Sequence, residues 1–195
     1  KNQELNNIDL DSKLGLDVFS SAYRAIGNDY YQVKYNNVAT QTIIEPFGIF
    51  KFNHSSIESL DYEIGFRYHY YELDTDNYTT KTSLSSDDRQ NYAWSIGANY
   101  NLRNEENIFT HISRAYRAPR LDEIISLISP SPTHSYIKHQ YSNDIELGYE
   151  VIVDKQRFKT SVFRTLIKNQ IYLNQSTFKN ENFDPSVHQG LEIEF

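Results

Sequence analysis

The chain has 195 residues, a formal net charge of −7, and neither cysteine nor methionine. Without cysteine it has no disulfide framework and no zinc–thiolate site, and its diffuse acidic charge argues against a nucleic-acid binder, which needs a basic face. No apolar run approaches the roughly 18 residues that a transmembrane helix requires. The missing initiator methionine and the N-terminal "KNQELNNIDL", which does not resemble a signal peptide, indicate a processed or excised piece of a longer chain.

Aromatic residues are numerous, with 16 Tyr and 11 Phe, and most of them lie in alternating runs. In "LDYEIGFRYHY" (60–70) every second residue is apolar or aromatic, and "YAWSIGANYNL" (92–102) repeats the pattern. A side-chain period of two is typical of strands with one apolar and one polar face. No long segment shows the helical period, so the sequence predicts an all-β fold.

The predicted strands follow one another along the whole chain. In chain order they lie near residues 12–24, 28–36, 43–52, 60–72, 92–102, 108–117, 143–153, 157–173 and 187–195. After residue 43 the connections alternate between short and long. The short ones are 53–59, 103–107 and 154–156, and the long ones are 73–91, 118–142 and 174–186.

This alternation places every long connection at the same end of the sheet, as in outer-membrane β-barrels, which have short periplasmic turns and longer extracellular loops. A strand of about 11 residues at ~3.3 Å each, tilted by ~45°, also spans the ~25 Å apolar band of such barrels. A soluble β-sandwich, acting as a binding module, explains the alternation equally well but not the loop pattern.

In a barrel, the polar face lines the lumen and the tyrosine-rich face touches lipid. The residues expected to face the lumen are Glu63, Arg67, His69, Asn99 and Arg103, and those expected in the aromatic girdles are Tyr62, Tyr92 and Tyr100. The length allows about eight strands, which suits a small closed barrel with an adhesin or structural role. It also suits a partial antiparallel transmembrane β-barrel, about eight to nine strands of a ~22-stranded transporter.

One motif favours the transporter. "AYRAPRLDEI" (115–124) follows a predicted strand that Pro119 ends, because proline lacks a ladder donor. The segment resembles the "F-R-A-P…(D/E)E-L" box of TonB-dependent outer-membrane receptors. The matching residues are Tyr116, Arg117, Ala118, Pro119 and Glu123.

Other segments resemble the motifs of the same family in the same order, over about residues 43–195. They are "YEIGFRYHYYE" (62–72), "WSIGANYNLRNEENIFTHISRAYRAP" (94–119), "SNDIELGYEV" (142–151) with Glu146 and Gly148, "VFRTLIKNQIYL" (162–173), and "HQGLEIEF" (188–195) with Gly190 and Glu192. One segment departs from the pattern. "YIKHQYS" (136–142) stands where the family usually has "N-P-x-L-x-P-E".

The resemblance implies that residues 1–195 are a partial β-barrel domain of a receptor in the bacterial outer membrane, with the plug domain and the remaining strands outside this chain. Such a receptor takes up a scarce nutrient, here expected to be an iron complex such as a siderophore or haem. Its partners are then the lipid bilayer, a small iron or metal chelate and, through the plug, the TonB energy-transducing complex. No nucleic acid, no resident cofactor and no enzymatic activity are expected, since the sequence contains no nucleophile motif, phosphate loop or acid pair.

Four residues are candidates for binding the substrate. Arg117 and Arg120 either pair with Asp122 or Glu123 and hold the loop base, since arginine suits bidentate carboxylate pairing, or help to bind an anionic chelate. Haem receptors of the family typically place a histidine between the Arg-Ala-Pro box and the next strand, where this chain has His134 and His139. Imidazole also binds transition metals, but a spacing of five matches no dedicated metal motif, and both histidines equally suit solvated loop positions.

Overall fold

The computed structural model describes residues 8–54, 60–77, 82–103, 105–126, 133–134, 137–177 and 179–195. Nearly all of them lie in antiparallel strands, and no helix among them is long and apolar enough to cross a membrane. The elements are β1 (Ile8–Asn28), β2 (Lys34–His54), β3 (Leu60–Asn77), β4 (Thr82–Arg103), β5 (Glu106–Arg117), α1 (Leu121–Ile124), β6 (Ile125–Ser126), β7 (Thr133–His134), β8 (Gln140–Val153), β9 (Gln156–Lys168), β10 (Ile171–Asn174), β11 (Lys179–Asn182) and β12 (Ser186–Glu194).

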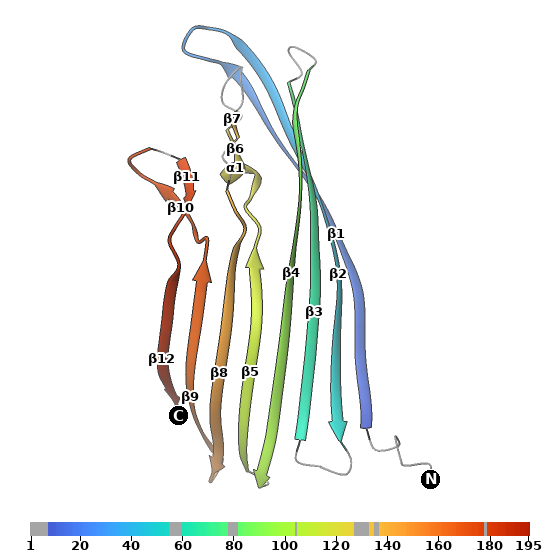
Figure 1. Cartoon of the computed structure of the whole chain (residues 1–195), viewed down its shortest axis with the longest axis vertical. Helices are drawn as coiled ribbons and strands as arrows, with labels where there is room; N and C mark the ends of the chain where they lie inside the picture. Colours follow the sequence, from blue (N-terminus) through green and yellow to red (C-terminus); the bar gives the residue numbers. More distant parts are fainter. Residues whose placement is uncertain are drawn as a thin grey trace.

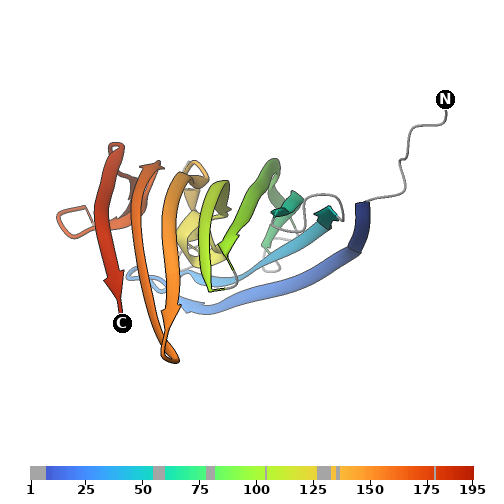
Figure 2. The same cartoon turned by 90° about the horizontal axis from the view of Figure 1, so that it is seen from below.

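Eight of these strands form one sheet in the order β1-β2-β3-β4-β5-β8-β9-β12, with β1 and β12 at its two edges (Figure 1). Seen from below, the sheet curves into an open arc, and the segment around α1 lies on the concave side (Figure 2). β6 pairs with β7 and β10 with β11 in separate two-stranded sheets. The predicted partial antiparallel barrel of eight to nine strands is confirmed.

The two faces of the sheet differ in chemistry. Residues that pair across strands lie on the same face, so the register assigns each side chain to the convex or the concave face. The convex face exposes large apolar side chains, among them Leu14, Leu16, Val18, Ile64, Phe66, Ile96, Ile112, Ile145, Leu147, Val162 and Leu191. Tyr92 and Tyr100, expected in the aromatic girdles, are also exposed on this face, and Tyr62 stacks on Phe52 there. Glu63, Arg67, His69 and Asn99 lie on the concave face, which agrees with a polar lumen.

The predicted strand at 28–36 is wrong, because residues 29–33 form the turn between β1 and β2. Asp29 closes this turn: its side chain accepts a hydrogen bond from the Val33 N–H at 2.7 Å, and Gln32 has a φ of 65°. Tyr30 and Tyr31 give the segment a strand-like composition, but both are exposed at the tip. The predicted strand 43–52 is the lower half of the longer strand β2.

The predicted long loop at 73–91 is also wrong, because β3 and β4 continue as a ladder that pairs Asn77 with Thr82. The outward-facing residues of this stretch are polar, which resembles a loop. Leu73 and Thr75, however, are completely buried on the concave face, and the register shifts only after Thr75.

The predicted strand 157–173 is divided into β9 and β10 at Asn169, whose φ of 55° interrupts the extended backbone. The predicted short connection at 154–156 is confirmed. Asp154 and Lys155 both have positive φ, 52° and 70°, as the tight hairpin turns that match strand twist require. The other long connections, 118–142 and 174–186, contain α1 with β6 and β7, and the β10–β11 hairpin.

Phenylalanine rings on the concave face lie over glycines of the neighbouring strand. Phe47 covers Gly15, Phe109 covers Gly148, and Phe163 covers Gly190, each from the cross-strand partner position. A Cβ built on Gly148 would stand 2.1 Å from Cζ of Phe109. The ring of Phe109 also contacts Lys159, whose Nζ lies 4.9 Å from the ring centroid.

We therefore expect Gly148→Ala to lower the free energy of unfolding by about 1–3 kcal/mol, the usual cost of overpacking. Gly97→Ala on the same face is the matched control, since its Cβ would meet nothing closer than 3.7 Å. That variant should be neutral or slightly stabilising, because glycine in a strand costs about 0.5–1 kcal/mol relative to alanine. Urea unfolding of the full-length protein measures both, and equal midpoints would contradict the role of Phe109.

Candidate functional site

The Arg-Ala-Pro box turns the chain at the long-loop end of β5. The strand ends at Arg117 and Pro119 is fully buried, as the motif predicts. Arg117 Nη2 donates to Glu123 Oε1 at 2.5 Å, and the backbone N–H of Arg120 donates to Glu123 Oε2 at 2.8 Å. The side chain of Glu123 is 11% exposed, so one shielded carboxylate closes the base of the loop.

The two arginines of the box have different surroundings. Arg117 is engaged by Glu123, which confirms the predicted pairing. Arg120 is 69% exposed and reaches Asp122 at 3.6 Å and Glu123 at 3.9 Å only through long ion pairs. The guanidinium of Arg120 is therefore accessible to a ligand on the long-loop side.

Helix α1 anchors this loop inside the curve of the sheet. Leu121 and Ile124 are buried and form one cluster with Ala39, Tyr71 and Leu73 of the concave face. Burying such side chains contributes about 1.5–3 kcal/mol each. The segment after the box thus folds inward, over the upper lumen wall.

A carboxylate on β2 joins the box to the lumen wall. Glu45 accepts hydrogen bonds from Arg67 Nη1 at 2.7 Å and from the Tyr116 hydroxyl at 2.7 Å, and its Oε1 lies 2.6 Å from His69 Nδ1. Arg67 also donates to Asp17 at 2.7 Å. Three neighbouring strands and the first residue of the box therefore meet at Glu45.

The sequence did not point to Glu45 as a site residue. It stands in "IEPFG", where a single acid before proline looks like an ordinary strand residue. The signal that was present is its spacing: Glu45 shares its parity with Ile43 and Phe47 and therefore faces the lumen. Its partners are 22, 24, 28 and 71 residues away in sequence, so only the register of the sheet brings them together.

His139 lies beside this cluster. It is 9% exposed, stacks on Tyr71 with ring centroids 5.5 Å apart, and lies 5.9 Å from the His69 ring. Its Nδ1 is 3.1 Å from the Asn91 side-chain nitrogen. His69 faces the lumen, as predicted, and its Nδ1 contacts Glu45 there.

The other candidate histidine of this loop is His134. Its backbone lies in β7, and its side chain is outside the described residues, as are residues 127–132 of the same loop. Among the residues whose side chains are described, no group of three or more His, Asp or Glu is placed to hold a metal ion.

The chain matches the family described as "TonB dependent receptor-like, beta-barrel" over residues 2–195. The chain belongs to the TonB-dependent receptor family. It is therefore an outer-membrane protein, and the members of this family are transport receptors. A comparison with curated proteins found no match.

Solved receptor structures share the fold. The closed form of the ferric-catecholate import receptor Fiu of E. coli K12 superposes with a TM-score of 0.62 at 15% identity, covering 95% of this chain and 32% of that chain. HasR of Serratia marcescens, a double mutant in complex with its hemophore HasA and heme, gives 0.60 at 12% identity, covering 94% and 39%. The siderophore receptor PirA of Pseudomonas aeruginosa gives 0.51 at 15% identity, covering 98% and 48%. This chain thus spans a third to a half of these receptors.

The remaining motif residues of this TonB-dependent receptor lie in the barrel wall. Gly148 and Gly190 lie under the rings of Phe109 and Phe163. The missing side chain of each glycine leaves room for the ring of its cross-strand partner. Glu146 faces the lumen opposite His111, while Glu192 is exposed on the edge strand β12. The segment that departs from the family pattern contains Ile137 and His139, both buried.

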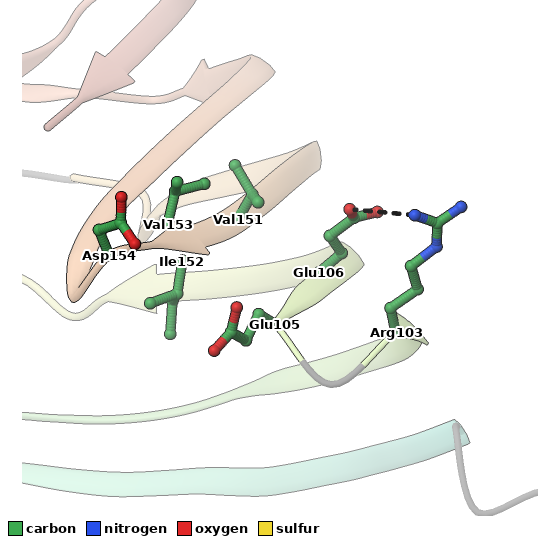
Figure 3. A pocket seen from close by; sticks show the side chains of 7 residues that line it. All are labelled: Arg103, Glu105, Glu106, Val151, Ile152, Val153 and Asp154. Carbon is green, nitrogen blue, oxygen red and sulfur yellow. Dashed lines mark ion pairs between the residues drawn. The ribbon is translucent and has the colours of Figure 1, made fainter.

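A hollow of about 790 Å³ lies at the opposite, short-turn end (Figure 3). The β4–β5 and β8–β9 turns border it, and the Ile152 N–H donates to the Glu105 carbonyl at 2.8 Å. Arg103, expected to face the lumen, lies here with its side chain 80% exposed and 4.0 Å from Glu106. The hollow lies at the other end of the sheet from the box, and the Arg103–Glu106 ion pair borders it.

Beside the box, a carboxylate organises the β10–β11 hairpin. Glu181 accepts hydrogen bonds from Asn174, Thr177 and Tyr172, at 3.0, 3.1 and 3.2 Å. These hydrogen bonds, that from Asn174 first, hold the pKa of the Glu181 carboxyl below its usual value of 4.5. A lowered folded-state pKa means that the stabilisation is fully present above pH 4.5 and is lost as pH falls through the lower folded value.

We expect the hairpin of the folded receptor to loosen only below pH 4.5. The measurement is the resistance of the hairpin to acid-active protease between pH 6 and pH 3. Glu181→Gln should remove most of this pH dependence, whereas Asp184→Asn, which changes an exposed acid of the same loop, should preserve it. A pH dependence that survives in Glu181→Gln contradicts the assignment.

Proposed function

We propose that this chain is part of an outer-membrane receptor that binds an iron complex on the cell exterior and imports it with energy from TonB. The observation that carries the proposal is the family match over residues 2–195. The arrangement of the box agrees with it, because the motif closes a loop at the long-loop end and packs that loop into the lumen. The sheet contributes wall, lumen lining and the two long connections that follow β5 and β9, and a plug domain and further strands complete the receptor.

A ferric chelate is the substrate class that we favour. Arg120 presents an exposed guanidinium at the loop base, suited to an anionic oxygen ligand. The names of Fiu and PirA describe a ferric-catecholate importer and a siderophore receptor, which supports the same class. His139 is buried against Tyr71, a position that favours holding the loop over ligating haem or a metal.

The test uses the full-length receptor expressed in iron-starved cells that lack other iron receptors. We expect uptake of radioactive iron from a catecholate or hydroxamate complex, and no uptake in cells that lack TonB. Haem is tested as a third iron source. If cells take up haem but neither chelate, the substrate is haem and not a ferric chelate. Iron uptake that persists without TonB would contradict the proposed function.

Arg120→Ala should lower the rate of chelate uptake about tenfold, which corresponds to one charge-assisted hydrogen bond of ~1.5 kcal/mol. Arg103→Ala is the matched control, because Arg103 is equally exposed at the opposite end of the barrel. Equal uptake by Arg120→Ala and Arg103→Ala would show that Arg120 does not contribute to chelate binding. The proposal that the receptor transports an iron complex would not be affected.

A further inference from the structure

One arginine of the barrel lies on the face that touches lipid. Arg114 of β5 pairs in register with Trp94 of β4 and Asn143 of β8, one step above the apolar row of Ile96, Ile112 and Ile145. These isoleucines are 40–50% exposed on the convex face. An arginine among lipid-facing side chains is costly unless its charge reaches the interface or a partner.

Two tyrosines hold the guanidinium of Arg114. Its Cζ lies 4.6 Å from the Tyr92 ring centroid and 4.3 Å from the Tyr141 ring centroid. Cation–π contacts of this kind restrict the orientation of the guanidinium but use none of its in-plane N–H donors. The guanidinium is therefore fixed in place with donors available.

These donors are not satisfied within the described part of the chain. Arg114 Nε is buried without a hydrogen-bond partner, and no ion pair among the described residues includes Arg114. A buried donor without a partner is costly, and the cost is greater for a charged group. The Nη1 and Nη2 groups of Arg114 also make no hydrogen bond within the described residues, but they are not buried. An acceptor from outside the chain that reaches them would offset part of this cost.

Two further cations share the surface. Lys168 of β9 pairs in register with Tyr141, and its Nζ lies 5.9 Å from the centroid of that ring. Arg164, exposed on the same face of β9, pairs with Ile145. The acids of the adjacent β8, Asp144 and Glu146, lie on the concave face, opposite Ser113 and His111.

The height of this surface places it at the outer leaflet. Arg114 is eight residues above the start of β5 at Glu106, which at ~3.3 Å per residue and a tilt of ~45° is roughly 19 Å of the ~25 Å apolar band. A long arginine side chain reaches the remaining distance by extending toward the headgroups. The short turns lie at the periplasmic end, so the headgroups it reaches are those of the outer leaflet.

We propose that Arg114, Lys168 and Arg164 bind a phosphate group on the headgroup of an outer-leaflet lipid, with Tyr92 and Tyr141 holding the guanidinium in position. Arginine binds phosphate through paired N–H donors, and lysine adds a point charge. The charges are complementary, because these three cations, which form no ion pair with an acid among the described residues, border an apolar face suited to acyl chains. This site is separate from the substrate site and does not depend on which nutrient is imported.

The test is lipid retention by the full-length receptor, measured by native mass spectrometry after extraction from phosphatidylcholine vesicles doped with lipid A or with dephosphorylated lipid A. We expect lipid A to be retained, and its apparent affinity to fall at least about tenfold in the double variant Arg114→Gln, Lys168→Gln. Removing the phosphate should weaken binding as much as removing the cations does. The affinity of the unmodified receptor for dephosphorylated lipid A should therefore be no higher than that of the double variant for lipid A. Inorganic phosphate at millimolar concentration should leave lipid A bound, which shows that the lipid and not free phosphate occupies the site.

Arg24→Gln is the matched control, since Arg24 is an exposed arginine of the long-loop end that donates to Asn36. It should retain lipid A normally. If the double variant does not fold, Lys168→Gln and Arg114→Lys are measured singly, and each should weaken retention. Equal retention of lipid A by the folded double variant, or equal retention of both lipids, would overturn the proposal.

Discussion

Replacing Glu45 with alanine is expected to lower the free energy of unfolding of the receptor by about 3–5 kcal/mol, the range for removing one partner from a buried charged pair. Glu45 is 14% exposed and serves Arg67, His69 and Tyr116 at once. Its loss leaves His69 and Tyr116 without this partner and leaves Arg67 with Asp17 alone. Urea unfolding of the full-length protein, followed by tryptophan fluorescence, measures the change.

Two variants test the origin of this effect. Glu45→Gln keeps an acceptor oxygen and should cost clearly less than Glu45→Ala. Glu63→Ala removes another carboxylate of the same face, one that pairs with Lys51 at 3.2 Å but is 44% exposed. An exposed pair contributes about 0–1 kcal/mol, so Glu63→Ala should be nearly silent, and a similar loss in both alanine variants would argue against a special role for Glu45.

Glu123→Ala is expected to release the loop that follows the box and to lower iron uptake about tenfold or more. The substitution leaves the Arg117 guanidinium and the Arg120 N–H without their acceptor, which costs about 1–3 kcal/mol. That energy is comparable with what holds a short helix such as α1 against the lumen wall. Proteolysis between residues 118 and 139 of the folded receptor should accelerate in parallel, and this readout is independent of the substrate.

Asp122→Ala provides the comparison within the same helix. Asp122 is 62% exposed and contacts Arg120 only at 3.6 Å, so its removal should change neither proteolysis nor uptake by more than about twofold. If Glu123→Ala resists protease as well as the unmodified receptor does, the carboxylate does not hold the loop.

The strand predictions succeeded where one face is lipid-like and the other is polar. β3 to β5, β8 and β12 alternate clearly. The ends of β5, β8 and β12 lie within three residues of the predicted ones, and β3 and β4 contain the predicted ranges but continue beyond them at the long-loop end. The errors occur where that contrast is absent. Most residues of 73–91 are polar, yet Leu73 and Thr75 are completely buried. Leu73 packs in one cluster with Leu121 and Ile124 of the loop that folds inward. At 28–36 two tyrosines imitated a strand in what is a turn.

In the candidate site, too, contacts between residues close in sequence could be predicted and contacts between distant strands could not. The pairing of Arg117 with Glu123 was predictable, because they are only six positions apart and the turn at Pro119 lies between them. The packing of His139 on Tyr71 and the contact of Tyr116 with Glu45 were not, since these partners come from distant strands. The outward position of Arg114 follows only from the register of β5 against β4 and β8.

The sequence by itself determined the all-β class, the lipid-facing and lumen-facing sides of most strands, the end at which the long connections gather and, through the box, the family. These follow from local causes: side-chain parity, turn chemistry and short motifs. Only the tertiary structure decided that the loop after the box folds into the lumen, that Glu45 connects it to the wall, and that Arg114 meets two tyrosines on the outer face. The physical reason is that such contacts depend on the stagger between strands and on the curvature of the sheet, which bring residues up to 71 positions apart within hydrogen-bond distance.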